Sequence, residues 1–228
     1  TLVNKTMEAY LRKCGEEAAE LFEWPIRGKY PPKIDLSVKN VRQTGNRLYE
    51  FEALEAYVAE RRKKTGNALV WGGYLEHRMI YSSSPLFHVT QHPRNIHLGI
   101  DFWTNAGTAV HAPLAGTVHS FQDNAAFRDY GPTIVLQHTM HGRTVHTLYG
   151  HLSRASLDGL ELGQSIHKGQ RIAWLGAPSE NGNWPPHLHF QIIVDMQGRK
   201  GDYPGVCALE ELKAYSTNCP DPRWLLKI

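Results

Sequence analysis

The sequence predicts a mainly β protein, an antiparallel β-sandwich or barrel-like sheet, preceded by a helical N-terminal segment. Within residues 1–67, apolar residues recur at helical spacing. From residue 68 onward, short runs rich in Val, Ile, Thr and aromatic residues are bounded by Gly, Pro or Asn. Short strands separated by turn residues are typical of antiparallel sandwiches and barrels. We therefore expect a helical segment over residues 1–67 and a β-rich domain over residues 68–228.

Two helices are expected in the first part. Residues 1–23 form the first, because apolar residues recur there at spacings of four and three with charged residues between them. These apolar residues are Met7, Leu11, Cys14, Ala18 and Leu21. Trp24-Pro25 ends this helix, since proline cannot continue a helical hydrogen-bond ladder. The second helix runs from about Leu48 to Lys64.

The β-rich part contains short runs that we expect to form strands. They read ALVWGGYLEHRMIYS, HLGIDFW, AGTVHSFQ, TIVLQHTMHGRTVHTLYGHLS, RIAWLG and HLHFQIIVD. The fourth run is predicted to form a β-hairpin that turns near His141-Gly142. The C-terminal segment CPDPRWLLKI is expected to dock on the domain as an irregular segment.

Charge and composition exclude some classes of protein. A net charge of +3 implies no broad nucleic-acid surface, and the basic run at 61–64 is interpreted as a solvated last helical turn. No run of 18 apolar residues occurs, so no membrane span is expected. A Cys207–Cys219 disulfide stays open, as does a reducing compartment. A cytoplasmic location is slightly favoured; the protein is periplasmic or secreted if a leader was removed before Thr1.

The first candidate site lies in HLGIDFW, residues 97–103. Side chains alternate between the faces of a strand, so His97, Gly99 and Asp101 share one face, and the apolar residues between them face a core. Gly99 leaves open space between the imidazole and the carboxylate. An unpaired carboxylate on a half-buried sheet is costly, and a metal ion or hydrogen bonds would offset that cost.

Two further strands present polar side chains in the same way. In HLHF, His187 and His189 share a face, and in TLYGHLS the same rule places Tyr149 beside His151. The three strands would then gather four histidines, one aspartate and one tyrosine on one side. Imidazole and carboxylate ligands with one position left for water are typical of a catalytic zinc site. The alternative is that these are ordinary solvent-facing positions of strands.

Taken in order, HLGID, LYGHLS and PPHLHFQ resemble the three signatures of the lysostaphin-like (LytM-type) zinc metalloendopeptidases. The segments VHAPLAGTV and IHKGQRIAWLG are also similar to parts of that family. The resemblance covers residues 94–196, about half of the chain. The same block resembles, more loosely, the peptidase-like module found in fusions with kinase-like and class III aminotransferase parts.

The resemblance implies a LytM-type peptidase domain and roles for individual residues. His97, Asp101 and His189 match the zinc ligands of the family. His151 and His187 match its two catalytic histidines. The implied cofactor is Zn²⁺, and the implied partner is a peptide or peptidoglycan-type substrate.

Three further residues are candidates for the cleft. Tyr149 would be an extra donor near the site. His77 and Arg78 lie just upstream of the block, in a segment that could cross the cleft, contact substrate or block zinc; a plain edge strand is the alternative. The sequence departs from the family at Gln191, where Glu is common, and in the segments ENGNWPP and QDNAAFRDYGP. We expect these departures to affect substrate preference.

The expected function is zinc-dependent hydrolysis of peptide bonds, in peptidoglycan cross-links or in glycine-containing peptides, by a zinc-activated water and two catalytic histidines. Which of His151 and His187 is the base stays open. One alternative is a non-catalytic or latent LytM-type binding or regulatory module, latent if residues 1–90 cover the site. The other is a histidine phosphocarrier, since the glucose-type IIA proteins resemble this fold and also carry HxGxD; the HxH strand favours the peptidase.

Overall fold

The computed structural model describes residues 2–29, 31–45, 47–64, 66, 69–81 and 93–228. Its helices are α1 (Leu2–Glu17), α2 (Val38–Thr44), α3 (Phe51–Lys64), α4 (Leu212–Asn218) and α5 (Arg223–Leu226). Its strands are β1 (Val70–Gly72), β2 (Ile96–His97), β3 (Ile100–Trp103), β4 (Ala109–His111), β5 (Gly116–Asn124), β6 (Gly131–Met140), β7 (Arg143–Gly150), β8 (Ser165–Ile166), β9 (Arg171–Trp174), β10 (His187–Ile193) and β11 (Val206–Cys207). Short 3₁₀ turns are η2 (Arg154–Leu157) and η3 (Leu209–Glu211).

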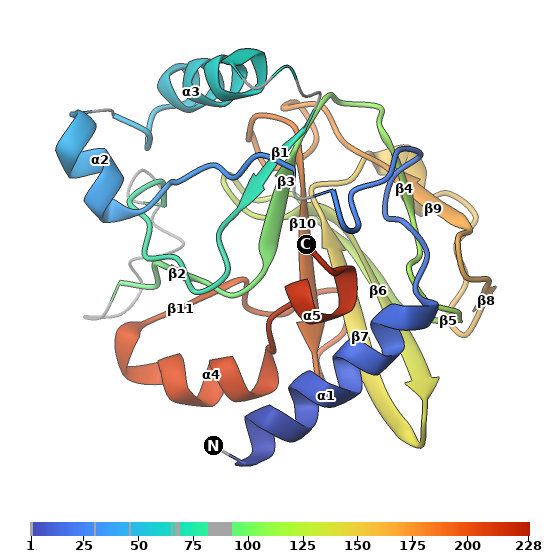
Figure 1. Cartoon of the computed structure of the whole chain (residues 1–228). Coiled ribbons are helices and arrows are strands. Elements are labelled where there is room, and N and C mark those ends of the chain that lie inside the picture. Colours follow the sequence, from blue (N-terminus) through green and yellow to red (C-terminus); the bar gives the residue numbers. More distant parts are fainter. Residues whose placement is uncertain (1, 30, 46, 65, 67–68, 82–92) are drawn as a thin grey trace.

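One antiparallel sheet dominates the molecule (Figure 1). Its strands follow the order β1-β3-β10-β7-β6-β5-β8, with β1 and β8 at the two edges. Two smaller sheets, β11-β2 and β4-β9, are also antiparallel. The prediction of a mainly β, antiparallel domain with helices at its N-terminus is therefore confirmed.

The place of β10 within the sheet brings the sequence motifs together. His189 lies opposite Asp101 of β3 on one side and opposite Gly150 of β7 on the other. Opposed residues of antiparallel strands have Cβ atoms about 5 Å apart, so side chains on that face meet. Leu188 and Phe190 alternate with the histidines and are buried in the main core. The alternation expected for HLHF thus separates core from site.

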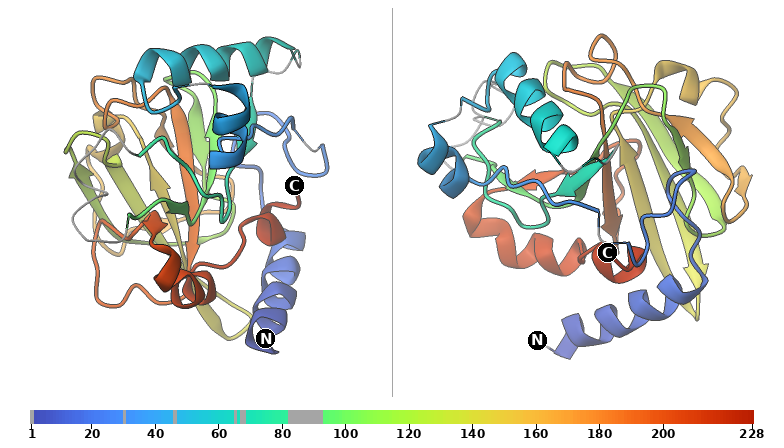
Figure 2. Two further views of the ribbon diagram at one scale, coloured as in Figure 1. Left: turned by 90° about the vertical axis from the view of Figure 1, so that its left-hand side faces the viewer. Right: turned by 45° about the horizontal axis from the view of Figure 1, so that its top comes forward.

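Helix α1 and the loop after it contribute to the main core. Leu11, Leu21 and Phe22 are buried in one cluster with Phe102 of β3. The rings of Phe22 and Phe102 meet edge to face, with centroids 5.6 Å apart. Figures 1 and 2 show α1 beside α5, far from α3, which covers the other end of the sheet. The expected boundary at residues 67 and 68 lies outside the described residues.

The first helix ends earlier than expected, at Glu17 rather than at residue 23. Beyond it, the backbone bonds to the β-rich part instead. The N–H of Ala19 donates to the carbonyl of Pro113, and the carbonyl of Leu21 accepts from the N–H of His111. Tertiary hydrogen bonds therefore override a helical apolar pattern here.

Helix α2 was not expected, although its ends carry clear signals. The Ser37 hydroxyl accepts a hydrogen bond from the N–H of Asn40, as an N-cap residue does. Gly45 has the left-handed φ of 69° that favours glycine at a helix C-terminus. The second predicted helix is α3, which begins at Phe51 rather than at residue 48.

The strand expected over HLGIDFW is split in two. Strand β2 pairs with β11, whereas β3 pairs with β1 and β10. Leu98 between them is buried in a different cluster from Ile100 and Phe102. His97 and Asp101 consequently reach the site from two strands of different sheets.

The predicted hairpin is confirmed at its turn. Strand β6 ends at Met140 and β7 begins at Arg143. His141 and Gly142 both have positive φ, 48° and 75°, as a two-residue type I′ turn requires. The C-terminal segment docks as expected, but the prediction that it is irregular was wrong, because residues 223–226 form α5.

The cysteines among the described residues form no disulfide bond. Cys14, Cys207 and Cys219 are free thiols, and all three are buried. No helix among the described residues combines the length and the apolar character that crossing a membrane requires.

Candidate metal centre and active-site cleft

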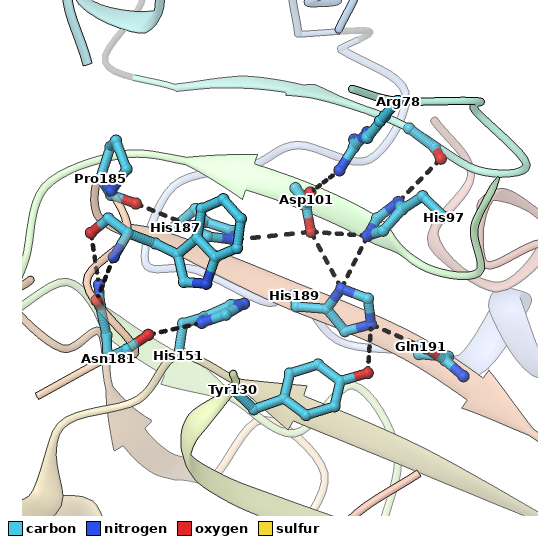
Figure 3. A network of polar contacts seen from close by, with 12 residues as sticks. Arg78, His97, Asp101, Tyr130, His151, Asn181, Pro185, His187, His189 and Gln191 are labelled. Atoms are coloured by element: carbon cyan, nitrogen blue, oxygen red, sulfur yellow. Dashed lines mark hydrogen bonds and ion pairs between the residues drawn. The ribbon is translucent and has the colours of Figure 1, made fainter. Parts of the chain in front are cut away.

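Three side chains converge on one point of the cleft. Nε2 of His97 lies 2.9 Å from Nδ1 of His189, and Oδ1 of Asp101 lies 3.2 Å from each of these nitrogens (Figure 3). All three side chains are buried. Ligand atoms about 2.1 Å from a tetrahedral zinc ion are on the order of 3.4 Å apart. The donor atoms therefore form a triangle of the size that such an ion needs.

The charges of this triangle suit a divalent cation. Burial, assisted by the Arg78 guanidinium, lowers the pKa of His97 to about 4, so the ring is neutral at pH 7. Burial alone would raise the pKa of Asp101, but His97 and Arg78 outweigh it and hold that pKa well below its usual range. The centre thus offers a carboxylate and neutral imidazole, which are zinc-type ligands.

Each ligand histidine is oriented by a hydrogen bond from its other nitrogen. Nδ1 of His97 donates to the carbonyl of Gly73 at 2.9 Å, which leaves a lone pair on Nε2. Nε2 of His189 donates to Oε1 of Gln191 at 2.9 Å, which leaves a lone pair on Nδ1. Gln191 is itself held, since its amide donates to the carbonyl of Pro204. Such partners fix the tautomer and the ring orientation of metal-binding histidines.

His151 and His187 face the same cleft with a common arrangement. Nδ1 of His151 donates to the carbonyl of Asn181 at 2.9 Å, and Nδ1 of His187 donates to the carbonyl of Pro185 at 2.8 Å. The two ring centroids are 4.1 Å apart. Nε2 of His187 lies 3.9 Å from Oδ1 of Asp101. Each ring therefore keeps Nε2 as a proton acceptor.

Burial sets the protonation state of these two rings. It lowers the pKa of His187 to about 4. For His151, burial and then the neighbouring His187 hold the pKa well below its usual value. Both imidazoles are consequently neutral at pH 7, the form that a general base needs.

Tyr149 does not lie beside His151, so that expectation is corrected. Its ring is fully buried in the main core, with its centroid 5.4 Å from that of Phe190. Its hydroxyl lies 3.0 Å from that of Thr147. The alternation rule fails because β7 ends at Gly150 and His151 has a left-handed φ of 63°.

Of the two candidates upstream, Arg78 reaches the centre and His77 does not. Arg78 is buried, and its Nη1 donates to Oδ2 of Asp101 at 2.6 Å while its Nε donates to Glu76 at 2.7 Å. His77 is exposed and takes part in an isolated bridge to Ile96. The segment thus contributes Arg78, Ile80 and Tyr81 to the cleft lining, but not His77. Since Arg78 binds the second oxygen of Asp101, it leaves Oδ1 to the metal triangle.

The cleft is a cavity of about 330 Å³ whose lining includes residues that motif analysis did not single out. Tyr130, Arg128 and Trp184 come from the two segments noted as departures from the family. The hydroxyl of Tyr130 lies 3.4 Å from Nε2 of His189. Trp103 stacks on His187, with ring centroids 4.0 Å apart. Only the unusual length and composition of those two segments pointed to them.

An antiparallel sheet that carries this His–Asp–His cluster, with two more histidines in the same cleft, is the arrangement expected for a peptidase domain of the LytM type. The family model of peptidase family M23 matches residues 95–202, which include all five of these side chains. The part of the chain that carries the cleft is therefore similar to this family.

Individual relatives are distant and longer. The DD-carboxypeptidase/endopeptidase Mpg of Neisseria meningitidis serogroup B is 28% identical over 131 residues, 55% of this chain and 28% of that protein. Lysostaphin of Staphylococcus staphylolyticus is 32% identical over 100 residues, 44% of this chain and 19% of that protein. The chain therefore spans less than a third of the length of these relatives.

Parts of the chain are also similar to solved structures. The catalytic domain of lysostaphin from Staphylococcus simulans is 27% identical, with a TM-score of 0.42, over 59% of this chain and 81% of that one. A zinc containing peptidase from Vibrio cholerae is 31% identical, with a TM-score of 0.36, over 44% of this chain and 28% of that one.

Proposed function

We propose that the chain is a zinc-dependent metalloendopeptidase that hydrolyses peptide bonds, in peptidoglycan cross-links or in glycine-containing peptides. The observation that carries this proposal is the donor triangle of His97, Asp101 and His189 beside two neutral histidines. The match of residues 95–202 to peptidase family M23 supports a peptidase rather than a phosphocarrier. Similarity to a DD-carboxypeptidase/endopeptidase and to lysostaphin supports a peptide as the substrate.

His97, Asp101 and His189 would hold the metal, through Nε2, Oδ1 and Nδ1. When bound, zinc supplies Lewis-acid polarisation of the scissile carbonyl and activation of a water at neutral pH. Gly73 and Gln191 keep the two imidazole lone pairs directed at that position. The protein's own contribution is therefore a rigid and buried set of donors.

His151 and His187 would move protons at Nε2. Their Nδ1 atoms are committed to the carbonyls of Asn181 and Pro185, so only Nε2 can accept a proton from the attacking water or return one to the leaving amine. Asn181 is fully buried, and its amide donates to the carbonyl of Trp184. The loop that orients His151 is thus fixed by its own hydrogen bonds.

The test pairs metal analysis with digestion. The purified chain of residues 1–228 is assayed for bound zinc, then incubated with purified peptidoglycan and with a panel of glycine-rich peptides. We expect stoichiometric zinc and cleavage that stops when a chelator is added. The His187→Ala variant is the control for a contaminating hydrolase. Zinc bound at full occupancy without cleavage of either substrate would contradict the peptidase and favour a latent or non-catalytic module.

A further inference from the structure

A second buried arginine lines the cleft near the two histidines. Arg128 lies in the loop between β5 and β6, only 3% of its surface is exposed, and it lines the same cavity as the metal ligands. Its guanidinium lies over the ring of Trp184, 4.2 Å from the centroid. The Trp184 ring meets both His151 and His187, at 6.2 and 6.3 Å between centroids. The Trp184 ring thus lies next to both this positive charge and the histidines.

Arg128 has few hydrogen-bond acceptors among the described residues. Its Nε and Nη1 are buried and have no hydrogen-bond partner among the described residues. Its Nη2 has only a long contact, 3.4 Å, to the carbonyl of Tyr49. Burial lowers the pKa of Arg128, and Glu52 only partly opposes this effect. Since a buried charge without acceptors is costly, this group is suited to an anion that comes from outside.

Arg78 shows what a buried arginine looks like when its charge is satisfied internally. Its Nε and Nη1 bind Glu76 and Asp101 at 2.7 and 2.6 Å. Two other buried donors in the cavity lining have no partner among the described residues, Nη2 of Arg78 and Nε1 of Trp103. The cavity lining thus holds buried donors that its own carboxylates, Asp101, Asp129, Asp202 and Glu211, leave unpaired, and a ligand with acceptor atoms would satisfy them.

We propose that Arg128, supported by Trp184, binds a carboxylate of the ligand beside the catalytic histidines. Charge-assisted hydrogen bonds from arginine to carboxylate are among the strongest in proteins. The carboxylate is either the C-terminus of a peptide or an acidic side chain. The placement of this group next to the scissile bond rests on the proposed peptidase function; the carboxylate site itself is a property of binding. The chain would accordingly act on peptides that carry a free carboxylate close to the cleaved bond.

Binding is tested on the zinc-loaded full chain with ligands that contain no bond between two amino acids. N-acetylglycine is compared with N-acetylglycinamide, which lacks only the terminal carboxylate. N-acetylglutamate α-amide is compared with N-acetylglutamine α-amide, which lacks only the side-chain carboxylate. Dissociation constants come from NMR titration. We expect about tenfold tighter binding of one or both carboxylates than of the matched amides.

Three variants show whether Arg128 is responsible for the preference for carboxylates over the matched amides. Arg128→Met should abolish the preference for carboxylate, and Arg128→Lys, which keeps the charge, should retain part of it. Arg199→Met is the matched control, because Arg199 also lines the cavity over an aromatic ring, Tyr203, and this variant should keep the full preference. Circular dichroism shows whether each variant is folded, and Arg128→Lys keeps the test decisive if Arg128→Met is not.

The outcomes also separate this inference from the proposed function. Equal binding of acids and amides, no measurable binding of any of the four ligands, or a preference that survives in both Arg128 variants would overturn the carboxylate site. Peptide cleavage without a carboxylate preference would leave the peptidase standing and remove the subsite. A carboxylate preference without cleavage of any peptide would support the carboxylate site and contradict the proposed peptidase function.

Discussion

Nη1 of Arg78 lies 2.6 Å from Oδ2 of Asp101, so one oxygen of the carboxylate is bound by an arginine and the other faces two imidazole nitrogens. This pairing fixes the orientation of a buried carboxylate and keeps it ionised. Replacing Arg78 by an uncharged residue would break this pair and would also remove a positive charge near the metal position. We expect the loss of orientation to dominate, because the freed carboxylate would be buried and only partly paired.

The first prediction follows from that pairing. Arg78→Met should weaken zinc binding by about 10- to 100-fold, the effect typical of losing a partner of a metal ligand. Competition with a chromophoric chelator measures the affinity. Arg78→Lys should lose less zinc affinity than Arg78→Met, because lysine keeps a charged donor. Arg94→Met is the control, since Arg94 lines the cavity but donates to the carbonyl of Val206. Wild-type affinity in Arg78→Met would contradict the role given to this arginine.

The second prediction divides the five central residues by metal content. His97→Ala, Asp101→Ala and His189→Ala should each lose tightly bound zinc, because each removes one atom of the donor triangle. His151→Ala and His187→Ala should keep zinc and lose peptidase activity, because their Nε2 atoms lie outside the triangle. Elemental analysis of the purified variants is the measurement. Zinc at wild-type stoichiometry in Asp101→Ala would remove it from the ligand set.

The third prediction concerns Gln191, which accepts the Nε2–H of His189 at 2.9 Å. Gln191→Leu removes this acceptor and should lower zinc affinity about tenfold, since the ring and its tautomer are no longer held. Gln191→Glu keeps an acceptor oxygen and should bind zinc at least as well as the wild type. The same chelator competition distinguishes the two. Equal affinity in Gln191→Leu and the wild type would show that the ring is held by other contacts.

The fourth prediction is a pH dependence of stability that arises away from the cleft. Nδ1 of His138 donates to the carbonyl of Ala115, and Nε2 lies 2.7 Å from the hydroxyl of Thr147. Burial lowers its pKa from 6.5 to about 4, so the folded state favours the neutral ring. The unfolded chain therefore takes up this proton first as the pH falls. The stability from this residue is present above pH 6.5 and is lost between about pH 6.5 and 4.

The expected size follows from about 1.4 kcal/mol for each pKa unit, which gives on the order of 3 kcal/mol across this range. Urea unfolding at several pH values measures it. His138→Gln cannot titrate, so its free energy of unfolding should depend less steeply on pH in this window. Parallel pH profiles for the two proteins would assign the dependence to other groups.

The core of the site could be predicted from sequence because a short-range rule governs it. Alternation along β10 separates His187 and His189 from Leu188 and Phe190 in the structure, as the sequence predicts. The rule does not extend past a strand end, which is why it misplaced Tyr149. It also could not show that HLGIDFW belongs to two sheets, because that break depends on β11, more than 100 residues later.

The hydrogen-bond partners of the site residues could not be predicted from sequence for the same reason, because they are distant along the chain or carry no motif. Arg78 could be named as a cleft residue, but its partner Asp101 is 23 positions away and meets it only through the fold. Gly73 and Gln191 carry no motif that marks them as partners of the ligand histidines. Helix α2 is different, since its capping residues Ser37 and Gly45 are local signals that the sequence itself contains.

The loop after α1 makes the motif-bearing block unsuitable as an independent fragment. Phe22 packs edge-on against Phe102, one residue from Asp101, and Leu11 and Leu21 fill the same cluster. A truncation that keeps only the sheet would expose the hydrophobic surface behind the candidate metal centre. It would also remove packing from β3, the strand that carries Asp101. The amino-terminal helix and the loop after it therefore belong to the same packed core as the sheet that carries the candidate site.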